Sequence, residues 1–288
     1  MGRKMPKKEE IPSGDTYMGR KMPEKEEIPS GDTCMGRKMP KKEETMNRHD
    51  ELLAAYCRRK NIGHVLNLCT DFDFSLVPAI QERPVNPDGS EGTGRDWFGT
   101  YWEYVPEQRA SMVTDSPEKR VITDIAKWRE QLVFPDLEAY DWEKAAAEDT
   151  KNWDRENKLT LVMLINGVFE RSHELLGFEE ALIAMYEEPE LYKELLDALC
   201  EYKIQCIKII GKYWKPDILN AHDDYGANNQ MLMSVEMWEA FFKDNLKKIV
   251  DAAHEAGMLY QHHSCGYIEP IFEQFIEIGV DGVDPLQV

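Results

Sequence analysis

Residues 159–170 read LTLVMLINGVFE, a nearly continuous apolar run that ends in polar groups. Such a run predicts a strand buried on both faces, as in a parallel sheet that helices cover. The interpretation of the whole C-terminal half follows from this strand.

Predicted helices and strands alternate after it. Pro189 suits the first turn of a long helix, and Ser234 suits the N-cap of another. Further strands are expected in PDILNAHDDYG (216–226), MLYQHHSCG (258–266) and VDGVDPLQV (280–288). This alternation predicts either an open doubly wound sheet or a (β/α)8 barrel. Because no GxGxxG or GxxxxGK[ST] motif stands at a strand-to-helix turn, the TIM-type (β/α)8 barrel is favoured.

The segment before residue 159 carries three weaker signals. ELLAAYCRRK (51–60) predicts a short amphipathic helix, and HVLNLCTDF (64–72) predicts a strand that ends near Asp71 and Asp73. Alternating aromatic residues between Trp97 and Tyr104 predict a β-hairpin or a lid.

Residues 1–45 are built from a 17-residue repeat, MGRKMPKKEEIPSGDTY and its variants. Charged residues, Pro, Gly and Ser dominate the repeat, and it has almost no apolar face to bury. We therefore expect a disordered tail over 1–45, and a globular domain over 46–288. The tail is either a duplicated segment ahead of a start near Met46 or a partner-binding arm.

Composition excludes several classes of partner. The chain has 288 residues and a formal net charge of −19, so its average surface repels a phosphate backbone and nucleic acid is not an expected partner. No apolar window reaches the roughly 18 residues needed to span a bilayer, which argues against a membrane role. Six scattered cysteines lack the spacing of a secreted disulfide scaffold, so a cytoplasmic location is expected.

Three predicted strands end in polar residues. Asn166 ends the first, the pair Asp223 and Asp224 follows His222 at the end of the second, and QHHSCG (261–266) ends the third. In a (β/α)8 barrel such ends meet at one mouth. His263 and Cys265 would project to the same side of their strand, because side chains alternate.

An H-x-C pair at a strand end can bind one metal ion. Imidazole nitrogen and thiolate sulfur suit zinc, but a catalytic zinc needs a third protein ligand. The pair is also compatible with simple packing, since a buried Cys is often a small hydrophobe. Asp223 and Asp224 could equally cap the next turn or serve the chemistry. His222 could be structural or, together with Asn166, bind substrate.

Four segments resemble the uroporphyrinogen decarboxylase superfamily, and in particular its corrinoid (methylcobamide) methyltransferase branch. They are DWFGTYWEYV, NGVFERSHELLGFEEALIAMYEEPE, DDYGANNQMLMSVEMWEAFF and HSCGYIEPIFEQFIEIGVDGVDPLQ. The resemblance implies a (β/α)8 barrel in which His263 and Cys265 bind zinc. The third zinc ligand of that branch is a cysteine beyond Val288, so the barrel is expected to be C-terminally truncated.

The resemblance also implies a reaction. Zinc-dependent methyl transfer would run between a methylated corrinoid on a partner protein and a small thiol or methylated small molecule. Asp223 and Asp224 would orient the reactants. The first-strand region, LNLCTDFDFS, lacks the arginines that would hold a tetrapyrrole with many carboxylates. Metal-free decarboxylation and an inactive fragment stay open as alternatives.

Overall fold

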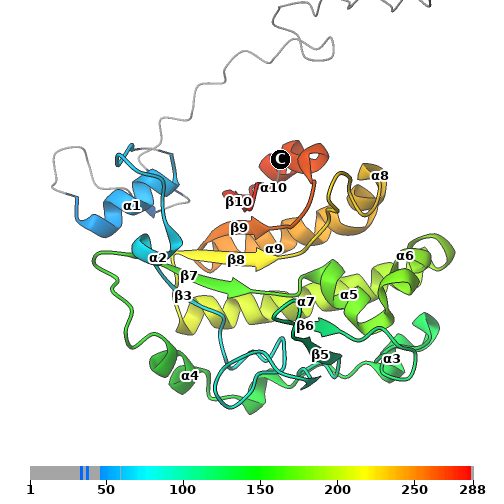
Figure 1. Cartoon of the computed structure of the whole chain (residues 1–288). Helices are drawn as coiled ribbons and strands as arrows, with labels where there is room; N and C mark the ends of the chain where they lie inside the picture. Colours follow the sequence, from blue (N-terminus) through cyan, green and yellow to red (C-terminus); the bar gives the residue numbers. More distant parts are fainter. Residues whose placement is uncertain (1–32, 35–36, 39–45, 59, 287–288) are drawn as a thin grey trace, which may run out of the picture.

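The computed structural model describes residues 33–34, 37–38, 46–58 and 60–286 (Figure 1). Its centre is a parallel sheet of five strands in the order β10-β9-β8-β7-β3. These strands are Phe72–Ser75 (β3), Leu159–Leu164 (β7), Ile218–His222 (β8), Leu259–His263 (β9) and Gly282–Asp284 (β10). The buried apolar run therefore lies in the sheet, between β3 and β8.

The register of the sheet brings the polar strand ends level with one another. His222 pairs with His263 across β8 and β9, and His263 pairs in turn with Asp284 of β10. Residues from three strands thus meet at one carboxyl edge.

Helices cover one face of the sheet. Val162, Leu219 and Tyr260 point from the strands into the large core, where they join the buried stripe of α7. Pro189 occupies the first turn of α7, as predicted. The helices after β7 are Val168–Leu176 (α5), Phe178–Glu187 (α6), Pro189–Tyr213 (α7), Val235–Trp238 (α8), Asp244–Glu255 (α9) and Phe272–Ile278 (α10). A π-helical segment, Glu239–Lys243, precedes α9, and a 3₁₀ turn, Glu269–Ile271, precedes α10.

The other face is covered at the start of the strands by α1, Arg48–Tyr56. Leu52 and Leu53 of α1 form a second cluster with inward-facing residues such as Leu161 and Ile218. Asn47 caps this helix by accepting a hydrogen bond from the backbone amide of Asp50 at 2.8 Å. In Figure 1, α1 lies at the opposite end of the strands from α5 and α8, so the carboxyl edge is free of it.

Between β3 and β7 the chain makes an excursion with its own antiparallel sheet, in the order β4-β5-β6. Trp102 and Phe98 are buried in it, and the hairpin predicted from the aromatic alternation is confirmed. Its elements are Gly94–Arg95 (β4), Tyr101–Val105 (β5), Ala110–Val113 (β6), Trp128–Gln131 (α3) and Trp142–Asp149 (α4), with 3₁₀ turns at Ile125–Lys127 and Leu137–Ala139.

One predicted strand was wrong. Within residues 64–72, Leu68–Asp71 forms a short helix (α2), and β3 begins only at Phe72. Asn67 explains the difference, because its side chain accepts a hydrogen bond from the backbone amide of Cys69 at 2.9 Å and starts a helical turn.

The α/β class with a parallel sheet is confirmed. Closure into an eight-stranded barrel stays a prediction, because the parallel strands of the described residues form one sheet of five strands. Most of the expected tail, 1–45, lies outside the described residues; Thr33–Cys34 (β1) and Arg37–Lys38 (β2) pair antiparallel. Among the helices that the structure describes, none has the length and apolar character needed to cross a membrane.

Candidate metal centre at the carboxyl edge of the sheet

Three side chains converge just beyond β8 and β9. Asp224, His263 and Cys265 each offer one donor atom, and these atoms all lie within 4.8 Å of one another. The Cys265 Sγ atom is 3.4 Å from His263 Nε2, and Nε2 is 3.9 Å from Asp224 Oδ1. The predicted H-x-C pair therefore does meet, and a carboxylate joins it.

Strand alternation explains which residues face this site. His262 and Ser264 are fully buried on the helix side, where His262 packs against Phe275. His263 and Cys265 are only partly buried and point to the inner side of the sheet. The prediction that these two project together agrees with the structure.

Close backbone packing fixes the loop that carries Cys265. Gly266 has a φ of +80°, and a Cβ there would lie 2.3 Å from the carbonyl carbon of Gly226. Asp224 accepts a hydrogen bond from the backbone amide of Cys265 at 2.7 Å. The loops after β8 and β9 are thus held against each other, with their donor atoms on one side.

The donor set is compatible with zinc. Usual Zn–S and Zn–N bond lengths of about 2.3 and 2.0 Å place two tetrahedral donors about 3.5 Å apart, close to the separation of Sγ and Nε2. Desolvation and then the charge of Asp224 raise the pKa of the Cys265 thiol to about 11. A site rich in carboxylates disfavours a bare thiolate and stabilises a cation.

Asp284 of β10 lies next to the Nδ1 atom of His263. Its Oδ2 atom is 3.3 Å from His263 Nδ1, on the other side of the imidazole from Cys265. Burial opposes ionisation, but hydrogen bonds from His263 and Gln261 leave the pKa of Asp284 below its ordinary value. In the sequence analysis Asp284 appeared only within the VDPLQ segment, and no role was predicted for it.

Asp223 and His222 occupy different surroundings from Asp224. Asp223 points toward α5, where its carboxylate accepts the backbone amides of Phe169 at 3.1 Å and Glu170 at 2.9 Å and the hydroxyl of Tyr225 at 2.8 Å. It therefore caps the start of α5 from another strand. Desolvation raises the pKa of Asp223 to about 6.

His222 lies beside the candidate metal centre. Its ring stacks on that of His263, with 3.9 Å between centroids. Burial, and then repulsion from His263, lower the pKa of His222 to about 3, so the ring is neutral. Its Nε2 atom has no hydrogen-bond partner among the described residues. A substrate-binding role for His222 stays a prediction.

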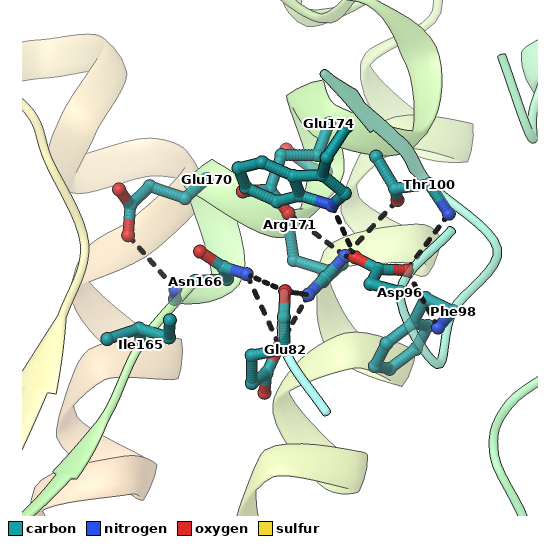
Figure 2. A network of polar contacts seen from close by, with 12 residues as sticks. Glu82, Asp96, Phe98, Thr100, Ile165, Asn166, Glu170, Arg171 and Glu174 are labelled. Carbon is teal, nitrogen blue, oxygen red and sulfur yellow. Dashed lines mark hydrogen bonds and ion pairs between the residues drawn. The ribbon is translucent and has the colours of Figure 1, made fainter. Parts of the chain in front are cut away.

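Asn166, just before α5, belongs to a buried network of polar contacts (Figure 2). It donates to the backbone carbonyl of Glu82 at 2.8 Å and is almost fully buried. Its φ of +56° is the left-handed conformation that Asn tolerates. The structure does not bring Asn166 to the three metal-type ligands, and its predicted contact with substrate stays untested.

That network centres on Arg171, which is completely buried (Figure 2). Its guanidinium contacts Glu82 and Asp96, and Glu174 lies 3.0 Å away. Lys203 of α7 also contacts Glu82. We call the charged residues of this network, Glu82, Asp96, Arg171, Glu174 and Lys203, the Arg171 cluster. It ties the excursion to α5 and α7. Sequence reasoning missed it because Glu82 and Asp96 are 89 and 75 residues away from Arg171 in the chain.

Within the described part of the chain, no other cysteine joins Asp224, His263 and Cys265 in this group of donors. Cys200 and Cys206 are buried in α7, and Cys69 is exposed in α2. Among the described residues, Asp224 is the third donor group beside His263 and Cys265. The cysteine ligand expected beyond Val288 stays a prediction.

A parallel βα sheet with metal-type ligands at its carboxyl edge defines a common class of enzyme scaffold. The sequence profile described as uroporphyrinogen decarboxylase (URO-D) matches residues 131–285. The chain therefore belongs to the URO-D family, and the resemblance found in the sequence is confirmed. The match includes every residue of the candidate metal centre.

Two further comparisons complete this result. A solved structure, a methyltransferase from Methanosarcina mazei, superposes with a TM-score of 0.56 at 15% identity. The alignment covers 83% of this chain and 76% of that chain, which is a likeness of fold. No curated protein matches the sequence.

Proposed function

We propose that this chain is a zinc-dependent methyltransferase that moves a methyl group between a corrinoid protein and a small thiol. The observation that carries the proposal is the convergence of Asp224, His263 and Cys265 on one point. Family membership and the fold shared with a methyltransferase support it.

His263, Cys265 and Asp224 would hold the ion, leaving one position open for the acceptor thiol. Zinc bound there would lower the pKa of that thiol, so that sulfur attacks as a thiolate. The methylated corrinoid of the partner protein would supply the methyl group to the thiol sulfur and, as the leaving group, would keep the electron pair of the carbon–cobalt bond. The thiol proton leaves to solvent.

The protein's own contribution is to orient these groups. The Gly226–Gly266 contact fixes the loops that carry the three ligands. Because both loops are attached to neighbouring strands of a rigid parallel sheet, the ligands are positioned before substrate arrives. Asp223 and His222 would act next to them, Asp223 by fixing α5 and His222 by covering one face of His263.

The test is zinc content together with methyl transfer from methylcobalamin to β-mercaptoethanol. We expect about one zinc per chain and measurable transfer in the wild type, both lost in Cys265→Ser. Cys69→Ser is the matched control, because Cys69 is an exposed free cysteine outside the site. A folded Cys265→Ser variant that keeps both zinc and transfer would refute the proposal.

Metal-free decarboxylation of a tetrapyrrole is the second candidate, because decarboxylation is the activity for which the family is named. Substrate carboxylates would need cationic partners, yet Arg171 is buried and paired with Glu82 and Asp96. Loss of carboxylate from uroporphyrinogen that survives a zinc chelator would favour this candidate over methyl transfer.

A further inference from the structure

Asp284 is the centre of a chain of hydrogen bonds along the inner face of the sheet. Its Oδ1 atom accepts from the side-chain amides of Asn220 at 2.8 Å and Gln261 at 2.7 Å. Gln261 in turn accepts from the hydroxyl of Tyr56 in α1 at 2.8 Å. The second oxygen, Oδ2, is left to face His263 Nδ1 at 3.3 Å.

This arrangement dictates which nitrogen of His263 carries its proton. A carboxylate oxygen only accepts hydrogen bonds, so the Nδ1 atom that faces it must be the donor. In a neutral imidazole the other nitrogen, Nε2, then has a free lone pair. That lone pair lies on the side of Cys265, whose Sγ atom is 3.4 Å away.

We infer that Asp284 is a positioning residue that locks His263 as the Nδ1–H tautomer and so makes Nε2 the metal ligand. Asn220 and Gln261 fix the orientation of Asp284, and α1 joins the arrangement through Tyr56. The inference rests on the proposed zinc site and adds to it the residue that prepares its imidazole ligand.

The hydrogen bonds of Asp284 make an unusual prediction for Asp284→Asn. Asn220 and Gln261 both present NH₂ groups to the Oδ1 position, so the amide oxygen of the new side chain must stay there. Its NH₂ group then faces His263 Nδ1 and donates to it. The proton of His263 is driven to Nε2, which blocks the metal. Asp284→Ala leaves Nδ1 free and is predicted to be less harmful than the isosteric change.

The experiment has two readouts on the full chain. The tautomer of His263 is read from its ¹⁵N shifts in metal-free protein, with the signals assigned by comparison with His263→Gln. Zinc affinity is measured by competition with a chromogenic chelator. Asp281→Asn is the matched control, since Asp281 holds His254 at 2.9 Å through the same kind of contact outside the site.

We expect the Nδ1–H tautomer in the wild type and in Asp281→Asn, and Nε2–H in Asp284→Asn. Zinc affinity should fall about 10- to 100-fold in Asp284→Asn and less in Asp284→Ala. An Nε2–H tautomer in the wild type overturns the inference and needs no variant to fold. So does an Asp284→Asn protein that binds zinc as tightly as the wild type.

The two readouts also separate this inference from the proposed function. If the wild type binds no zinc but shows the Nδ1–H tautomer, which Asp284→Asn inverts, the positioning role of Asp284 stands and the zinc proposal fails. If zinc binds and the tautomer does not depend on Asp284, the proposed function stands and the inference fails.

Discussion

Replacing Glu174 by Gln should abolish a pH dependence of stability that the Arg171 cluster creates. The cluster contains three buried carboxylates, Glu82, Asp96 and Glu174, and two buried cations, Arg171 and Lys203. Full ionisation would leave one uncompensated negative charge inside the protein. Glu82 and Asp96 hydrogen bond to Arg171, whereas Glu174 Oε2 lies 3.0 Å from the Arg171 guanidinium without forming a hydrogen bond to any described residue. Glu174 is therefore the carboxyl that stays protonated.

The size of the effect follows from the shift in the Glu174 pKa. Desolvation raises this pKa to about 8; Arg171 opposes the rise, while Asp96 and Glu82 add to it. Between the unfolded value near 4.5 and the folded value near 8, the native state holds a proton that the unfolded chain has lost. Stability therefore falls as pH rises through this window, by about 1.4 kcal/mol per pH unit from this one group.

The assay is denaturant unfolding at pH 5.5, 6.5 and 7.5 for the wild type and Glu174→Gln. A Gln amide cannot titrate, so the stability of the wild type relative to the variant should fall by about 3 kcal/mol between pH 5.5 and 7.5. Glu179→Gln, which changes an exposed residue of α6, is the control, and its free energy of unfolding should change with pH as that of the wild type does. If the free energy of unfolding of Glu174→Gln changes with pH as that of the wild type does, Glu174 is ionised in the native state and the reasoning is wrong.

Three further predictions test the rest of the structure. Asp224→Ala should lose zinc and lower the free energy of unfolding by about 1 kcal/mol, because the backbone amide of Cys265 loses its acceptor. Asp223→Ala should keep zinc and lower the free energy of unfolding by about 1–3 kcal/mol, because two backbone amides of α5 lose theirs. Zinc content separates the two variants, and loss of zinc in Asp223→Ala but not in Asp224→Ala would reverse the roles. Gly266→Ala should lower the free energy of unfolding by about 2 kcal/mol or more and weaken zinc binding, because the residue has a φ of +80° and its new Cβ would clash with Gly226. An unchanged free energy of unfolding would contradict the close contact. Arg171→Met should lower the free energy of unfolding by about 3–5 kcal/mol, because it leaves buried carboxylates unpaired. In the same denaturant-unfolding assay, the surface change Arg129→Met should lower it by about 0–1 kcal/mol.

Local sequence patterns predicted the parallel sheet because the strands and helix starts depend on interactions between residues that are close in the sequence. The apolar run of β7 and the Pro189 start of α7 are each decided within a few residues. The period of two in a strand was enough to place His263 and Cys265 on the same side. The strand predicted at 64–72 was wrong because Asn67 offered the backbone a competing hydrogen bond.

Contacts between distant parts of the chain could not be predicted in this way. Arg171 meets Asp96 and Glu82 across separations of 75 and 89 residues, and nothing local to Arg171 indicates either partner. Asp284 depends on the register of β10 against β9, which sets it beside His263. A one-residue slip would turn Asp284 toward the helices.

The adjacent carboxylates at the end of β8 show how one strand serves two purposes. Because successive side chains leave a strand on opposite sides, Asp223 must point to the helices if Asp224 points inward. Asp223 meets the exposed amides at the start of α5, where a carboxylate is favourable for both hydrogen bonding and the helix dipole. Asp224 meets the imidazole and thiol from β9. The same alternation in β9 buries His262 and presents His263, so two neighbouring strands each contribute one structural and one ligand-type residue. The helix layer and the candidate metal centre are therefore positioned by the same few peptide units.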